Sequence, residues 1–229
     1  MKNLFRSRFS VLFSVLALYI ILSFLVRIVL LIWSAGDADL NLFYILRAFF
    51  TGFCYDVTIG SLFLALYAVY LLIFPKKWIG SLFDKFFTYF YLTLIFIIIY
   101  FSLLAEIPFW DEFGVRFNFI AVDYLIYTYE VVENINQSYP LPLIGVVLIG
   151  LIVSTFFSFK KLNIFKETFS SKISSGKRLL FAIPFLAIAV VSGLVMKNKQ
   201  ADFSNNLVMN EVGKNGAFSF VTAFKSNEL

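Results

Sequence analysis

Charged side chains inside long apolar stretches are the first candidates for chemistry in this 229-residue sequence. Arg27, Arg47 and Asp56 stand in such stretches, and an ionisable group left in hydrocarbon is costly enough to count as a functional candidate. Helical rise puts Arg27 and Asp56 at similar depths below one membrane face, so we expect an intramembrane ion pair. Two alternatives stay open. In the first, each charge contacts lipid headgroups or water separately. In the second, the three residues serve ion transport, although a single ion pair is weak support for an ion pathway.

Other catalytic groups are scarce. The sequence has no His and one cysteine, Cys54, which excludes imidazole catalysis, His-bound zinc and an intramolecular disulfide. Four acids of one predicted loop suggest a hard-metal site, but they form no EF-hand pattern and topology alone accounts for them. They are Glu106, Asp111, Glu112 and Asp123. We therefore assign no catalytic residue, no metal ligand and no cofactor to this chain.

The composition identifies the setting of these residues. The chain is 61% hydrophobic and 14% charged, whereas a soluble domain carries about 25% charged residues. An integral membrane protein is the class that fits. The sequence pI of about 9.2 does not indicate nucleic-acid binding, because the basic residues are divided by membrane topology rather than gathered on one surface.

Five stretches are long enough to cross a bilayer, which takes about 20 apolar residues. We expect an all-α fold with transmembrane helices at about 9–33, 44–74, 86–104, 141–159 and 179–196. The first stretch is too long for a cleaved signal peptide. Together they define a transmembrane domain over residues 1–196, followed by an extracytoplasmic tail over 197–229.

Lys and Arg set the expected orientation. Of the nineteen basic residues, twelve fall on the side of the N-terminus and five on the other, and basic residues favour the cytoplasmic side. We expect the N-terminus inside and the C-terminus outside. Six of the twelve lie between Lys160 and Arg178. This cluster is either a topological signal or a site for anionic phospholipid.

The loop before the fourth span contains an amphipathic pattern. At 100° per residue, five polar side chains share one arc. They are Arg116, Asp123, Tyr127, Glu130 and Asn134. The pattern predicts an interfacial helix over about 113–136 with its polar face toward water; a re-entrant helix packed on the spans is the alternative.

Two stretches resemble a known family. They are EFGVRFNFIAVDYLIYTYEVVENINQSYP, from Glu112 to Pro140, and NNLVMNEVGKNGAFSFVTAFKSNEL, from Asn205 to Leu229. Both resemble the membrane part of the lipoteichoic-acid-synthase-like family of sulfatase-type phosphoglycerol transferases, in particular its Gram-negative branch. The segment TGFCYDVTIG of the second span, with Gly52 and Asp56, also resembles sequences of that family.

The resemblance implies five membrane helices in a bacterial inner membrane, followed by an extracytoplasmic catalytic domain. That domain would use a Thr nucleophile and Mn or Mg to transfer phospholipid headgroups. Its residues have no counterpart before Leu229, so we expect this chain to be the anchor of a truncated enzyme, with the bilayer and that domain as partners. The alternatives are a stand-alone membrane scaffold that binds a periplasmic partner and a small transporter subunit.

Overall fold

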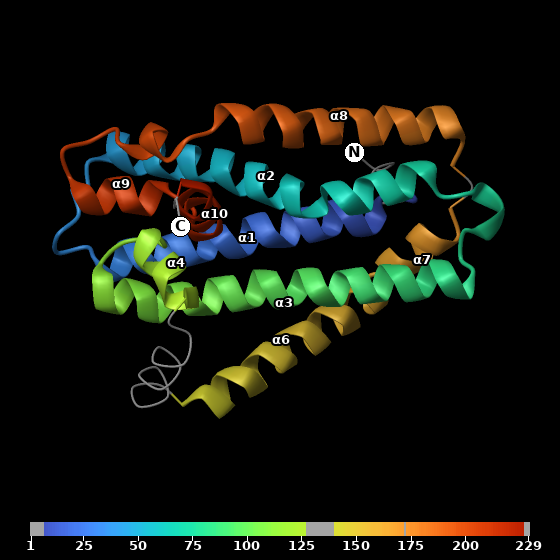
Figure 1. The fold of residues 1–229 in the computed structure, drawn as a ribbon, viewed down its shortest axis with the longest axis horizontal. Coiled ribbons are helices and arrows are strands. Elements are labelled where there is room, and N and C mark those ends of the chain that lie inside the picture. Colours follow the sequence, from blue (N-terminus) through green and yellow to red (C-terminus); the bar gives the residue numbers. More distant parts are fainter. Residues whose placement is uncertain (1–6, 127–139, 172, 227–229) are drawn as a thin grey trace. The chain divides into compact units, whose positions relative to one another are not determined.

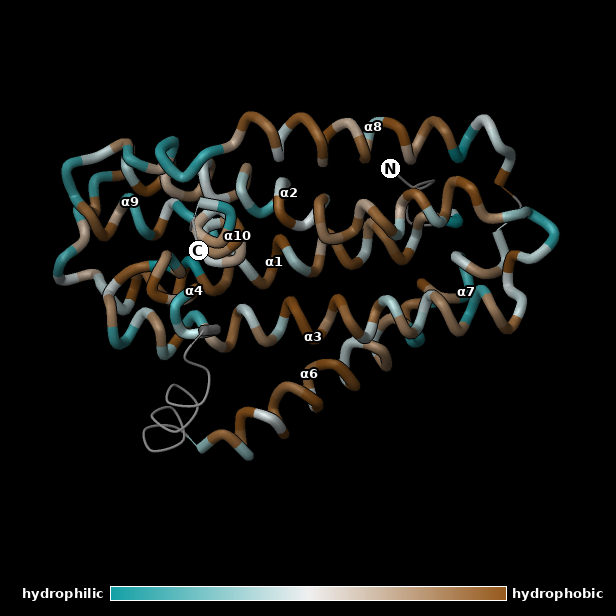
Figure 2. The backbone as a smooth tube through the Cα atoms, viewed as in Figure 1, coloured by the Kyte–Doolittle hydropathy of each residue, from teal (hydrophilic) through white to brown (hydrophobic). Residues whose placement is uncertain are grey.

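The computed structural model describes residues 7–126, 140–171 and 173–226, and within these ranges it is helical without strands (Figure 1). Five helices are long and apolar enough to cross a membrane: α1 (Ser10–Trp33), α2 (Leu42–Ile73), α3 (Leu82–Phe113), α6 (Leu141–Lys161) and α8 (Ser175–Val195). Hydrophobic residues dominate these five helices, and hydrophilic residues gather in the connections (Figure 2). The chain is a multi-pass membrane protein.

Shorter helices lie between the long ones or follow the last of them. They are η1 (Lys76–Trp78), α4 (Phe119–Ile126), α7 (Ile164–Phe169), η2 (Asn198–Ala201), α9 (Leu207–Gly213) and α10 (Gly216–Ser226). Four of the five predicted spans agree with the structure to within four residues at each end. The third does not, because α3 continues nine residues beyond Leu104. The charged Glu106 and the helix-breaking Pro108 end the apolar run in the sequence, but both residues lie inside the helix.

The predicted helix at about 113–136 begins later than expected. Phe113 is the last residue of α3, and Gly114 follows in the left-handed conformation, with φ of 65°. Its amide donates to the Trp110 carbonyl at 2.8 Å, a common way for glycine to end a helix. The next helix, α4, begins at Phe119, and the Asn118 Oδ1 atom accepts the Ile120 amide at 2.9 Å. The predicted start at 113 is therefore wrong, and residues 127–136 lie outside the described ranges.

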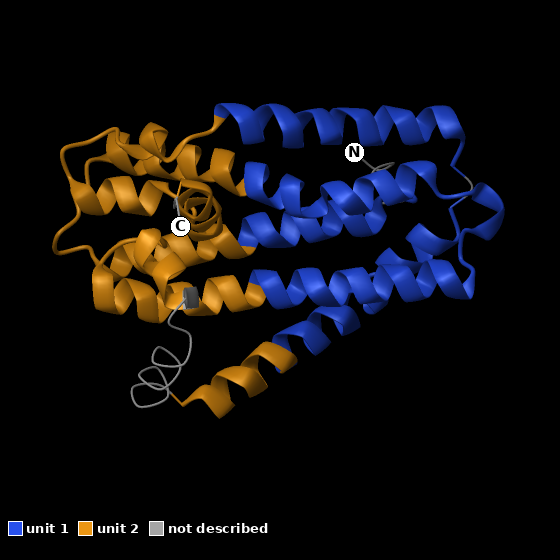
Figure 3. Ribbon diagram, in the orientation of Figure 1, with its two compact units in different colours: residues 1–21, 57–99, 150–195 blue, residues 22–56, 100–149, 196–229 orange. Residues whose placement is uncertain are grey.

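The chain forms two compact units (Figure 3). Unit 1 consists of residues 1–21, 57–99 and 150–195, and unit 2 of residues 22–56, 100–149 and 196–229. Aromatic contacts hold unit 1 together. Phe13 of α1 meets Phe185 of α8 at 6.1 Å between ring centroids, and Phe96 of α3 meets Phe156 of α6 at 5.4 Å.

Unit 2 has its own apolar core, built from four helices. The core consists of Leu30, Ala48, Trp110, Met209 and Val212. Two of these residues belong to α9, so the segment after residue 196 is part of the packed structure. The sequence predicts this segment as a polar extracytoplasmic tail. In the structure it folds into η2, α9 and α10, which is consistent with its burial of apolar side chains.

Candidate functional site

The structure brings the predicted intramembrane pair together in unit 2. The Arg27 Nη1 atom lies 3.0 Å from Asp56 Oδ2, and Nη2 lies 3.2 Å from Oδ1. The side chains are 0% and 1% exposed. A guanidinium that meets a carboxylate through two parallel bonds is the strongest geometry for such a pair. One charge on α1 is thus matched by one charge on α2.

The remaining polar atoms of the pair are also engaged. Ser23 Oγ donates to Asp56 Oδ1 at 2.7 Å, and Asn215 Nδ2 donates to the same oxygen at 2.8 Å. Arg27 Nε donates to the Val212 carbonyl at 3.0 Å, and Nη2 to the Lys214 carbonyl at 3.3 Å. Such additional hydrogen bonds offset the desolvation cost of a buried ion pair. The end of α9 and the two residues before α10 therefore complete the pair.

Asn215 acts on both sides of this contact. While its Nδ2 atom donates to Asp56, its Oδ1 atom accepts the Phe218 amide at 2.9 Å. That second bond is an N-cap of α10, which begins at Gly216. One side chain thus starts the last helix and ties it to the ion pair. A hydrocarbon side chain at position 215 would lose both bonds.

Gly52 leaves the space that the guanidinium occupies. It precedes Asp56 by one turn of α2, and a Cβ atom at position 52 would overlap the Arg27 guanidinium. Residues four apart lie on the same helix face, so the missing side chain and the carboxylate face the same arginine. This is the physical reason for glycine beside the pair.

A second ion pair lies in the same unit. Arg116 Nη1 bonds to Glu106 Oε2 in α3, and both side chains are at least 96% buried. The Arg116 amide donates to Glu211 Oε2 of α9 at 3.0 Å. A Cβ atom at Gly216 would overlap the Glu106 carboxylate. The C-terminal segment therefore contacts both ion pairs. It forms hydrogen bonds with each of them, and Gly216 also packs closely against Glu106.

The predicted polar face toward water is wrong for Arg116. This residue is 2% exposed and precedes α4, because the chain turns at Gly114 and carries the guanidinium inward to Glu106. Asp123 lies in α4 and is half-buried. Tyr127, Glu130 and Asn134 lie outside the described residues. The prediction of an interfacial helix therefore rests on α4 alone within the described structure.

The other candidates are dispersed. Arg47 is exposed, with its guanidinium 5.3 Å from the centre of the Phe203 ring. Among the described residues, no three His, Cys, Asp or Glu side chains lie close enough to hold a metal ion. Of the four acids that suggest a metal site, Glu106 is held by Arg116 instead.

Unit 1 contains an ion pair that the sequence does not predict. Arg8 Nη1 donates to Asp84 Oδ2 at 2.8 Å, and Nη2 to Oδ1 at 2.5 Å, with both side chains fully buried. Tyr70 Oη and the Gly80 amide also donate to this carboxylate, at 2.7 and 2.8 Å. Arg8 looks like one of several topological charges in the sequence. The usable signal is Asp84, an isolated acid among basic residues.

Comparison with models of known protein families, with curated proteins and with solved structures gives no match.

Proposed function

We propose that this chain is the membrane domain of a sulfatase-type phosphoglycerol transferase, and that unit 2 is the platform that holds the extracytoplasmic catalytic domain of such an enzyme. The sequence resemblance names the enzyme class. The contacts of the C-terminal segment supply the physical argument for a platform.

One observation carries the proposal. All three parts of the sequence that resemble the family contribute residues to the two neighbouring ion pairs of unit 2, Arg27–Asp56 and Arg116–Glu106. Gly52 and Asp56 come from the second span, Arg116 from the loop after α3, and Asn215 from the C-terminal stretch. Residues far apart in the sequence share a resemblance and also share a buried site, which favours a common structural purpose for them.

The purpose is to fix the direction of the chain as it leaves the membrane domain. A polar linker would let a following domain move freely. Here the segment is anchored at Lys197, whose carbonyl accepts Tyr55 Oη at 2.6 Å, and again at Val212 and Asn215. A domain attached after α10 would start from a fixed position, and a fixed position helps an enzyme meet substrates that lie in a bilayer.

The proposal includes an orientation and a membrane. The excess of Lys and Arg on the side of the N-terminus supports a cytoplasmic N-terminus and an extracytoplasmic C-terminus. The resemblance supports a bacterial inner membrane. In this orientation α4, within the predicted 113–136 region, lies on the extracytoplasmic side, where it would sit beneath the catalytic domain.

Catalysis belongs to the attached domain in this proposal. The resemblance implies Mn or Mg there, but the residues described in this chain do not supply a ligand set. Glu106 is engaged by Arg116, and Glu211 by the Arg116 amide and by Lys214 Nζ at 2.5 Å. We therefore derive no catalytic step from this chain. Its contribution is anchoring and positioning.

The experiment is a headgroup-release assay on the native gene product in membranes, with fluorescent phosphatidylglycerol and Mn²⁺. We expect release of the diacylglycerol product by the wild type, a clear reduction for Asn215→Ala, and none for the exposed control Asn205→Ala. Absence of turnover by the wild type would contradict the enzyme class. Turnover unaffected by Asn215→Ala would contradict the platform and favour a scaffold that binds a periplasmic partner.

A further inference from the structure

Unit 1 holds a buried arginine that forms no ion pair with a carboxylate of the described residues. Four arginine side chains are buried among the described residues: Arg8, Arg27, Arg116 and Arg178. The first three each form an ion pair with an acid of the chain. Arg178, in the first turn of α8, is 3% exposed and forms no ion pair with a described residue.

The guanidinium of Arg178 is only partly satisfied. Its Nη1 atom donates to the Phe74 carbonyl at 2.5 Å, while Nε and Nη2 are buried and have no hydrogen-bond partner in the described part of the chain. A buried charge without a partner is strongly destabilising. The carboxylate of Asp84 cannot be shared easily, because both of its oxygens already accept bonds from Arg8. The site therefore has two donors that an anion could engage.

Charged groups of both signs lie near the Arg178 guanidinium: Arg8, and the Asp84 carboxylate that Arg8 binds. The Arg8 guanidinium carbon lies 5.6 Å from the centre of the Phe74 ring, so two guanidinium groups meet at one residue. Three lysines close to this point along the chain, Lys76, Lys77 and Lys177, are exposed. An exposed Trp78 beside Lys77 is typical of the headgroup layer. Arg178 and these exposed lysines supply positive charge for a phosphate group.

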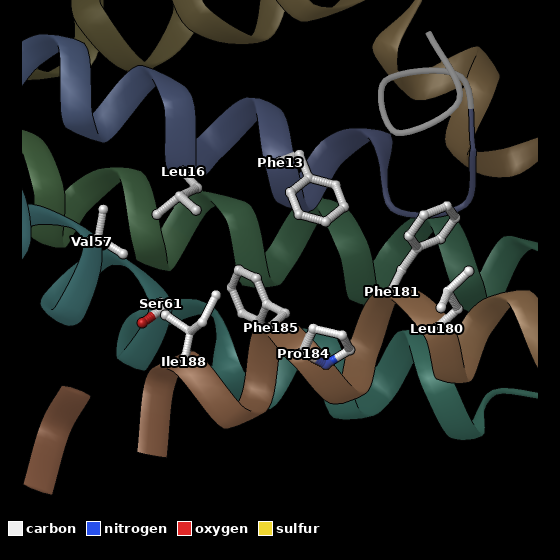
Figure 4. A pocket seen from close by; sticks show the side chains of 9 residues that line it. All are labelled: Phe13, Leu16, Val57, Ser61, Leu180, Phe181, Pro184, Phe185 and Ile188. Carbon is white, nitrogen blue, oxygen red and sulfur yellow. The ribbon is translucent and has the colours of Figure 1, made fainter. Parts of the chain in front are cut away.

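An apolar pocket begins within one turn of Arg178. It has a volume of about 210 Å³ and lies between α1, α2 and α8 (Figure 4). Its lining residues are Phe13, Leu16, Val57, Ser61, Leu180, Phe181, Pro184, Phe185 and Ile188. Phe181 and Phe185 follow Arg178 by three and seven residues, so all three lie on one face of α8. Arg178 and the pocket therefore follow one another along the same face of α8.

We propose that unit 1 binds an anionic phospholipid, with its phosphate on Arg178 and one acyl chain in the apolar pocket. The phosphate oxygens accept hydrogen bonds from Nε and Nη2, which Arg178 presents by turning its side chain at the expense of one bond to the Phe74 carbonyl. Guanidinium and phosphate match in geometry as well as in charge. A free phosphate ion would use the arginine alone, whereas a lipid also fills the pocket. This site is independent of the proposed function, whose platform lies in unit 2.

The test is native mass spectrometry of the full chain released from nanodiscs of phosphatidylcholine with phosphatidylglycerol. We expect the wild type to retain phosphatidylglycerol, and Arg178→Gln to bind it about tenfold more weakly, as for loss of a charge-assisted contact. Lys177→Gln, the adjacent exposed position, is the matched control and should bind normally. Ile188→Phe, which fills the pocket at a 49% exposed position, should also weaken binding without a change in charge.

Each result decides the matter. Equal retention of the two lipids by the wild type would overturn the proposal, and this measurement needs no variant. Equal binding by Lys177→Gln and Arg178→Gln would reduce the site to general surface charge. If inorganic phosphate protects the wild type from heat as well as phosphatidylglycerol does, and Ile188→Phe has no effect, the ligand is the anion and the pocket plays no part.

Discussion

Removal of Asp56 is the most informative perturbation of the buried network. This carboxylate accepts four hydrogen bonds, from Arg27 Nη1 and Nη2, Ser23 Oγ and Asn215 Nδ2. In Asp56→Ala the guanidinium stays buried without its counter-charge, and loss of one partner of a buried pair costs about 3–5 kcal/mol. We expect this loss in the free energy of unfolding, and a low yield of folded protein.

The double variant tests whether the loss arises from the pair itself. Arg27→Met in the Asp56→Ala background removes the orphaned charge and keeps most of the side-chain volume. The Val212 and Lys214 carbonyls lose their donors, at about 1 kcal/mol each, so recovery is partial. Ser23 Oγ and Asn215 Nδ2 stay without their Asp56 acceptor in both variants. We therefore expect the double variant to be less stable than the wild type but more stable than Asp56→Ala alone.

The assay is a denaturant titration in detergent, with the folded fraction followed by size-exclusion chromatography. Asp37→Ala, at an exposed acid of the same unit, is the control and should unfold like the wild type. A double variant whose loss equals or exceeds the sum of the single losses would refute the pairing as the source of stability. Asp56→Ala as stable as the control would likewise contradict a stabilising role for the pair.

Three further predictions concern single contacts. Gly52→Ala should destabilise unit 2 by about 1–3 kcal/mol, because its Cβ atom would overlap a guanidinium, whereas Gly145→Ala has open space and should be neutral or stabilising; denaturant titration compares the two. Asn215→Ala should make the C-terminal segment more sensitive to limited proteolysis than Asn205→Ala does, because a cap and a bond to the ion pair are lost. Asp84→Asn should lower the free energy of unfolding of unit 1 by about 3–5 kcal/mol, as for loss of a buried ion pair. Thermal unfolding measures this loss, and an unchanged midpoint temperature would contradict the structural role of Asp84.

Much of the fold follows from the sequence because the bilayer constrains it strongly. A spanning helix must satisfy its own backbone and present apolar side chains, so five helices can be recognised from composition and length. The third helix shows the limit of that argument. Its end depends on a contact between Glu106 and Arg116, and on a glycine that adopts a left-handed conformation, neither of which hydropathy records.

The candidate site was predictable only in part for a similar reason. Arg27 and Asp56 are conspicuous because they are charged within apolar runs. Ser23 and Asn215 are not, since small polar residues are common in helices and loops, and their role depends on the folded C-terminal segment. The prediction places Arg116 on the water-facing side of a helix over about 113–136. The turn at Gly114 ends α3 just before Arg116, so this residue does not belong to that helix. Sequence periodicity identifies faces of a helix but does not locate its ends.

The central proposal is that this chain anchors and positions the catalytic domain of a phosphoglycerol transferase. The most direct test is the mass of the native gene product in membranes, together with the reading frame beyond the codon for Leu229. The account predicts a continuation of several hundred residues that contains a Thr nucleophile and Asp or His metal ligands. A product of 26.3 kDa that ends at this codon would contradict it.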